Sequence, residues 1–165
     1  MNDVLRAIKE RRSVRRFASA PITREQVEAV LEAGRWAPSG KNTQPWRFVV
    51  VQSHDKREKL AALAPQAGMV AAAPVTLAVL LDRSAGYDTL KDAQGIGAAI
   101  ENILLAVHAL DLGACWMGRT RDAAIEAALE AKEDEELMAL IPIGHPAQQP
   151  GTGSRHPLQR ITRFI

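Results

Sequence analysis

Three segments of the chain place apolar residues on one face at helical spacing, over about residues 3–10, 23–34 and 90–112. A polar segment over about residues 53–64 and an alanine-rich one over about residues 122–131 also have helical composition. Local signals mark the ends of several of these helices: the capping-box pair Thr23 and Gln26, Ser53 at an N-terminus, and Gly34 and Gly113 at C-termini. We therefore expect five helices, with the longest at the centre of the core.

Continuous apolar runs between these helices predict buried strands over residues 46–51, 74–81, 114–117 and 137–143. Turn-forming residues make 37–45 and 82–91 loops, and the chain after Gly144 reads as an irregular tail that lies over something. Strands separated by helices without strict alternation indicate an α+β fold with a mixed central sheet packed by helices. No repeat or linker divides the chain, so residues 1–165 are expected to form a single domain.

Composition narrows the classes of protein that fit. The chain has 165 residues, which suits one domain with a sizeable core. Cys115 is the only cysteine, which excludes a disulfide scaffold and a cysteine-ligated metal site. Aromatic residues make up 4%, too few for a stacking surface for RNA. With no signal peptide and no apolar run long enough to span a membrane, the expectation is a soluble protein of the cytoplasm.

The net charge of +2 conceals an uneven distribution. Residues 1–17 hold six basic and two acidic residues, whereas residues 122–136 hold one basic and seven acidic residues. Within the basic segment the candidate binding residues are Arg11, Arg12, Ser13 and Arg15. Guanidinium groups pair with phosphate oxygens in a bidentate geometry, so this cluster is suited to phosphate, although a solvated basic edge would look the same. The charge is too nearly balanced to favour a nucleic-acid ligand.

Two further segments present polar groups at turns. The loop around Pro38, Ser39, Gly40 and Asn42 combines rigid turns with hydroxyl and carboxamide groups. These groups suit hydrogen bonds to the edge of a heterocycle, but the segment can equally be only a turn before a strand. Met117 and Gly118 close a predicted strand, at a point where a backbone amide could face a ligand.

Other motifs point to no site. The glycines at positions 95 and 97 lie inside a helical pattern and lack the third glycine of a dinucleotide fingerprint. The four histidines are never at metal-ligand spacing, and Cys115 reads as a small buried apolar residue. We therefore assign no metal ligand and no catalytic side chain.

Four segments, taken in order, resemble the FMN-dependent nitroreductase family in its short form. They are RRSVRRF at 11–17, APSGKNTQPWRFVVV at 37–51, NILLAVHALDLGACWMG at 102–118 and SRHPL at 154–158. The resemblance implies a homodimer with one FMN in each of two sites at the subunit interface, and a C-terminal tail that reaches over the partner. Compared with longer members, the chain is short over residues 82–91 and has Gly153 where they carry a second tail cation.

The resemblance also implies a role for each candidate residue. Residues placed like Arg11, Arg12, Ser13 and Arg15 hold the phosphate, ribityl chain and pyrimidine edge, and one placed like Arg155 returns to the phosphate. Residues placed like Pro38, Ser39, Gly40 and Asn42 line the flavin ring from the other subunit, and a pair placed like Met117 and Gly118 offers backbone near N5.

The function that follows is an oxidoreductase that takes hydride from NAD(P)H and reduces nitroaromatic or quinone acceptors in a ping-pong sequence through the flavin. Two alternatives stay open: another flavin reaction, such as reductive dehalogenation or dehydrogenation of a metabolite, and a protein that binds or sequesters flavin without turnover. A nucleic-acid binder that uses the basic N-terminus is a third class, which the short basic run does not favour.

Overall fold

A four-stranded antiparallel sheet forms the centre of the molecule in the computed structural model, which describes residues 2–118, 122–148 and 150–165. The strands are β1 (Trp46–Val51), β2 (Val75–Asp82), β3 (Gly113–Ala114) and β4 (Glu135–Gly144), in the spatial order β1-β2-β4-β3. All three strand pairs are antiparallel, and the parallel pairing in the described ranges is a single bridge between Ser13 and Ala114. The predicted α+β fold is confirmed.

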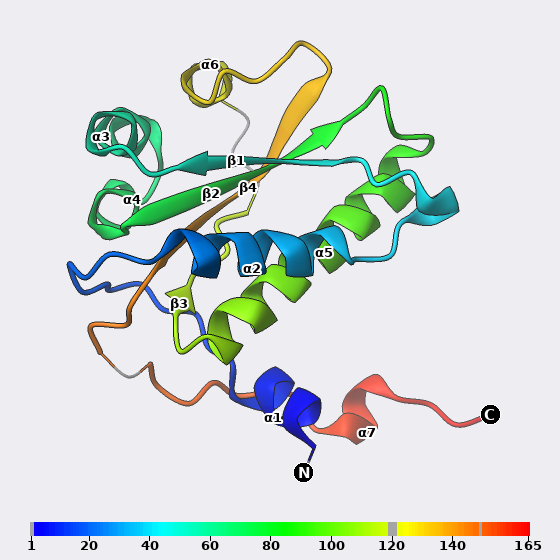
Figure 1. Ribbon diagram of the computed structural model, residues 1–165. Helices are drawn as coiled ribbons and strands as arrows, with labels where there is room; N and C mark the ends of the chain where they lie inside the picture. Colours follow the sequence, from blue (N-terminus) through cyan, green and yellow to red (C-terminus); the bar gives the residue numbers. More distant parts are fainter. Residues whose placement is uncertain (1, 119–121, 149) are drawn as a thin grey trace.

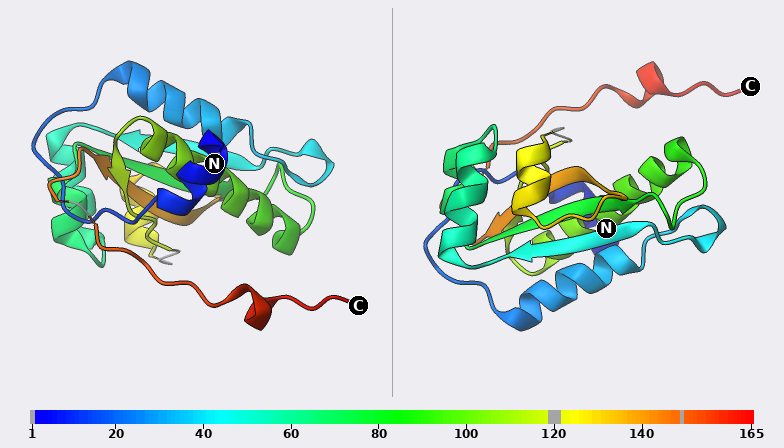
Figure 2. Two further views of the ribbon diagram at one scale, coloured as in Figure 1. Left: turned by 90° about the horizontal axis from the view of Figure 1, so that it is seen from below. Right: turned by 90° about the horizontal axis from the view of Figure 1, so that it is seen from above.

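Helices cover both faces of the sheet (Figures 1 and 2). On one face lie α2 (Arg24–Arg35) and α5 (Thr89–Ala109), and on the other lie α3 (His54–Leu63), α4 (Ala67–Ala72) and α6 (Ala123–Ala128). The alternation of side chains along β2 produces this division. Leu77 and Val79 join the core under α2 and α5, whereas Ala78 and Leu80 join the core under α3, α4 and α6. Each residue of β2 is buried, as its uninterrupted apolar sequence predicts.

The long helix α5 crosses beneath the sheet and carries the apolar stripe that the sequence predicts. Its buried residues include Ile96, Ile100, Ile103, Leu104 and Val107. This helix begins at the N-cap Asp88, whose side chain accepts a hydrogen bond from Lys91 N at 3.0 Å. Because α5 also contacts α1, α2, β2 and β3, it sets the positions of the segments at both of its ends.

Two peripheral helices bury no side chain against the rest of the chain. The first, α1 (Asp3–Glu10), exposes Val4, Leu5 and Ile8, and the second, α7 (Leu158–Ile161), lies on the C-terminal tail. Figure 2 shows the tail running away from the sheet and its helices. Phe164 near its end is 92% exposed, so the tail presents apolar side chains that the chain itself does not cover.

Several local expectations need correction. Gly113 does not cap α5, because the helix ends at Ala109 and Asp111 takes the left-handed conformation with φ 56°. Ser53 occupies the N-cap position of α3, but its side chain makes no capping hydrogen bond. Strand β1 is only partly buried, since it is the edge strand next to β2.

Some elements also differ in extent from the prediction. The apolar run after residue 113 forms only the two-residue β3 and a bridge at Met117, and α6 is shorter than the predicted helix. Helix α4 has no counterpart in the prediction because its six residues are too few to show a helical period. The short α7 (Leu158–Ile161) directly follows the run of residues 145–157 that was predicted to be irregular, and its four residues are too few to show a helical period.

Candidate functional site

The basic residues 11–16 leave α1 as an extended segment held against β3. The Val14 amide donates to the Ala114 carbonyl at 2.9 Å, and the Val14 side chain is buried at 6% exposure. Alternate residues of an extended segment point to opposite sides, so Ser13 and Arg15 face away from the surface that Val14 contacts. Because Val14 is buried against β3, the neighbouring Ser13 and Arg15 side chains remain available to a ligand.

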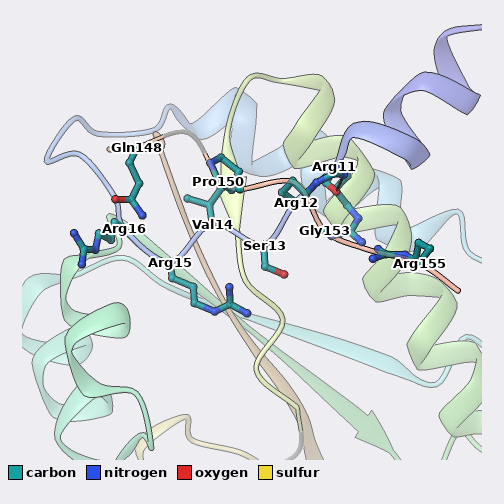
Figure 3. A pocket seen from close by; sticks show the side chains of 11 residues that line it. Arg11, Arg12, Ser13, Val14, Arg15, Arg16, Gln148, Pro150, Gly153 and Arg155 are labelled. Carbon is teal, nitrogen blue, oxygen red and sulfur yellow. Dashed lines mark hydrogen bonds between the residues drawn. The ribbon is translucent and has the colours of Figure 1, made fainter.

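These residues form one wall of a pocket of about 480 Å³, shown in Figure 3. The C-terminal tail forms the other wall. The pocket is lined by Arg11, Arg12, Ser13, Val14, Arg15, Arg16, Gln148, Pro150, Gly151, Gly153 and Arg155. Five of these residues are arginines and none is acidic, so among the described residues the pocket is strongly positive. Such a lining favours a ligand that carries a phosphate group.

Two arginines on the N-terminal wall of the pocket are held by the protein itself. Arg12 Nη1 donates to the carbonyl oxygens of Lys9 and Arg11, at 2.7 and 2.8 Å. Arg11 Nε lies 3.3 Å from Glu101 Oε1 in an ion pair, yet this buried atom makes no hydrogen bond. These contacts orient the two side chains in advance and reduce the entropy lost when a ligand binds.

The second predicted group lies in a tight turn, the 3-10 helix η1 (Gly40–Asn42), between α2 and β1. Lys41 and Asn42 have φ values of 53° and 56°, a left-handed conformation that is unfavourable for residues with side chains. Ser39 stabilises the turn, because its carbonyl accepts from Asn42 N at 3.0 Å and its hydroxyl accepts from Gln44 N at 2.9 Å. The Asn42 side chain is exposed and free to contact a ligand.

The third group, Met117 and Gly118, is only partly available. Met117 N donates to the Leu140 carbonyl at 2.9 Å, and Leu140 N donates back at 3.2 Å. The Met117 amide is therefore already used in the bridge to β4. Gly118 is exposed, with open space where a side chain would project. Of this pair, only Gly118 has a backbone that a ligand can approach.

A single chain does not bring the three groups together. Ser39 packs against Gly95 on α5, whereas Arg11 pairs with Glu101 on the same helix. Six residues correspond to about 9 Å along a helix axis and about 240° around it, so the two contacts lie on different sides of α5. Figure 1 likewise shows the turn of η1 (cyan) at the opposite end of α5 from β3.

Pocket residues that the sequence analysis did not single out include Arg16, Gln148, Pro150 and Gly151. Arg16 had a signal, because it continues the same basic run. Gln148 and Pro150 reach the pocket only through the path of the tail, which no local pattern specifies.

Among the described residues no group of three or more His, Cys, Asp or Glu side chains could hold a metal ion, and no helix is long and apolar enough to cross a membrane.

The fold and the pocket define a class: an α+β protein with an arginine-lined pocket between its N-terminal segment and its tail. Comparison with known families makes this specific. The family model described as "Nitroreductase family" matches residues 8–68 and 62–145. The chain belongs to the nitroreductase family.

Individual relatives match over most of the chain. A Methanothermobacter thermautotrophicus protein assigned as an NADH dehydrogenase/NAD(P)H nitroreductase is 36% identical over 154 residues, covering 91% of this chain and 81% of the relative. The NADPH-flavin oxidoreductase of Vibrio harveyi is 30% identical over 171 residues, covering 95% of this chain and 71% of the relative.

A solved structure extends the likeness to three dimensions. A Desulfovibrio desulfuricans protein assigned as a nitroreductase was crystallised in complex with FMN. It is 43% identical to this chain and superposes with a TM-score of 0.93, covering 100% of this chain and 98% of the other.

Proposed function

We propose that this protein is an FMN-dependent oxidoreductase that takes electrons from NAD(P)H and reduces small nitroaromatic or quinone acceptors. The observation that carries the proposal is the arginine-lined pocket, found in a chain 43% identical over its whole length to a protein that was crystallised with FMN. The relatives named as NADPH-flavin oxidoreductase and FMN reductase support the same donor and the same cofactor. We place the enzyme in the cytoplasm.

The residues of the pocket fit a flavin phosphate. Arg11, Arg12, Ser13, Arg15 and Arg155 would hold the phosphate and ribityl chain, since they supply charged and hydroxyl donors without a competing carboxylate in the lining. The Arg11 Nε atom is buried and faces Glu101, so the terminal nitrogens of Arg11 would have to supply its contacts to a phosphate. A phosphate dianion would neutralise part of the charge that now accumulates there.

We also propose that the working unit is a homodimer with two FMN sites at the interface. Pro38, Ser39, Gly40 and Asn42 lie on another side of α5 from the arginine pocket, so a second copy of the chain would have to bring its own turn to the ring. The exposed apolar residues of α1 and of the tail supply surface that a partner would cover. We expect the tail to lie over the partner subunit.

When bound, FMN would supply the redox chemistry, hydride transfer from the nicotinamide and electron transfer to the acceptor, and the residues of the arginine-lined pocket would hold it. The chain positions the reactants. The Asn42 carboxamide can both donate to and accept from the edge of a heterocycle, and Gly118 presents backbone near the reacting region. We assign no acid or base side chain. Donor and acceptor use one open face in turn, which gives ping-pong kinetics.

The test starts with the visible spectrum of freshly purified protein, which should show bound flavin. Anaerobic addition of NADH or NADPH should then bleach the flavin rapidly, and a nitroaromatic or quinone should restore its colour. Flavin that binds but is not reduced by either nicotinamide would identify a flavin-binding protein without turnover. Reduction without reoxidation by these acceptors would point to another flavin reaction on the same scaffold.

A further inference from the structure

Two lysines converge on the ring of Tyr87, the only tyrosine of the chain, beside the η1 turn. Lys41 Nζ lies 4.6 Å from the ring centroid, and Lys91 Nζ lies 5.4 Å from it. Lys41 belongs to η1, and Lys91 belongs to the first turn of α5. We call Lys41 and Lys91 the lysine pair.

The ring is held in place from two sides. Asp92 Oδ2 accepts hydrogen bonds from the amides of Tyr87 and Asp88, both at 2.9 Å, which fixes the backbone of the loop before α5. On the other side, Gly40 contacts the ring so closely that a Cβ atom there would lie 2.7 Å from Tyr87 Cε1. The platform that carries both ammonium groups is therefore ordered before any ligand arrives.

The two ammonium groups make no direct ion pair within the described residues, although Asp88 and Asp92 add negative charge nearby. The nearby acids have other roles, since Asp88 caps α5 and Asp92 accepts the two loop amides. A tyrosine face attracts each cation but leaves their mutual repulsion in place. An anion within reach of both ammonium groups would relieve that repulsion.

We propose that the lysine pair binds an anionic group, carboxylate, sulfonate or phosphate, of the substrate that reacts at the flavin. The placement supports this role, because Lys41 stands between Gly40 and Asn42, two residues proposed to line the ring. The inference rests on the proposed function and adds a substrate class to it. The anionic group can belong to the acceptor or to the nicotinamide donor, and the experiment separates these two sources.

The variants are Lys41→Gln, Lys91→Gln and the double substitution, with Lys59→Gln on α3 as a matched control. The readout is the ratio of kcat/KM for 4-nitrobenzoate to that for the neutral 4-nitrobenzamide. Lys41 and Lys91 would each form an exposed ion pair with the carboxylate of 4-nitrobenzoate. We therefore expect the double variant to lower this ratio about 3- to 10-fold, with a smaller effect in high salt. If instead the NADPH-to-NADH ratio falls, the donor phosphate is the ligand. Unchanged values of both ratios would overturn the proposal.

A second readout does not require the flavin, because Lys41, Tyr87 and Lys91 lie on one chain. Titration of inorganic phosphate into flavin-free protein should shift the NMR signals of the two lysine side chains and of the Tyr87 ring, and the double variant should lose the Tyr87 shift. If the wild type shows no shift and no charge selectivity, the anion site is rejected. If it shows the shift but the flavin is never reduced, the anion site stands and the proposed function fails.

Discussion

The Val14 side chain occupies the space that any side chain on residue 113 would need. A Cβ atom built on Gly113 would lie 2.6 Å from Val14 Cβ, closer than packed carbon atoms approach one another. The adjacent hydrogen bond from Val14 N to the Ala114 carbonyl, 2.9 Å long, holds the two segments together. This contact therefore sets how deeply the arginine segment lies against β3, and with it the shape of the pocket.

Substituting Gly113→Ala should push the arginine segment outward. We expect a loss of about 1–3 kcal/mol in the free energy of unfolding, typical of overpacking in a tight site, together with weaker FMN binding. Urea denaturation and flavin titration measure the two effects. The added substitution Val14→Ala should recover part of the FMN affinity, and Gly68→Ala, where a Cβ meets open space, should show neither loss. Unchanged flavin affinity in Gly113→Ala would contradict the proposed role of the contact.

Arg15→Ala should weaken FMN binding by about 1.5–3 kcal/mol, the scale for removing a hydrogen bond to a charged group. Riboflavin lacks the phosphate, so its affinity should change much less. Fluorescence titration of both flavins into wild type and variant gives the comparison, with Arg24→Ala on the exposed face of α2 as control. An equal loss for FMN and riboflavin would show that Arg15 does not contact the phosphate.

The proposed shared interface site predicts complementation between two defective chains. If Arg15 and Asn42 serve one flavin from different subunits, a heterodimer of Arg15→Ala with Asn42→Ala has one doubly damaged site and one intact site. Random mixing should give about half heterodimers and restore about a quarter of all sites. Equal amounts of the two homodimers, each folded but poor in FMN, are refolded together and tested for bound flavin and NAD(P)H oxidation. Absence of recovery, with heterodimers confirmed by native mass spectrometry, would exclude the shared site.

Steady-state kinetics test whether donor and acceptor use one place in turn. With NAD(P)H and a quinone varied together, double-reciprocal plots should give parallel lines, because the first product leaves before the acceptor binds. The connection between β2 and α5 spans only residues 83–88, and the anion platform proposed around Tyr87 serves this same single place. Intersecting lines would show a ternary complex and would contradict a common binding face.

Asp82 predicts a specific dependence of stability on pH. A hydrogen bond from the Ser84 hydroxyl, the amides of Ala85 and Ser84, and the Arg47 guanidinium hold the pKa of Asp82 below its ordinary value. The Asp82 carboxyl group therefore binds a proton more tightly in the unfolded chain than in the native chain. The contribution of Asp82 to the free energy of unfolding is present above the unfolded pKa of about 4. It is lost as the pH falls through the folded pKa.

The measurement compares wild type and Asp82→Asn by urea denaturation between pH 3 and pH 7, with the exposed Glu58→Gln as control. The stability advantage of the wild type should stay level above about pH 5 and shrink below about pH 4. An advantage that grows on acidification would reverse the predicted sign.

Local patterns in the sequence determined most of the secondary structure. The capping pair Thr23 and Gln26 starts α2 as predicted, because both partners of a capping box lie within one turn of the chain. The unbroken apolar run of β2 likewise identified a strand buried on both faces. The positive charge of the arginine segment was also visible, since charge is a property of the residues themselves.

The tertiary structure alone decided which distant residues meet. Gly113 looked like a helix cap, but its role is to admit Val14, which lies about one hundred residues earlier in the chain. In the same way Tyr87 meets Lys41 and Gly40, and Gln148 meets the arginine segment. Periodicity records which face of a segment is apolar, whereas these contacts depend on strand order and on the path of the chain between segments. No window of neighbouring residues contains that information.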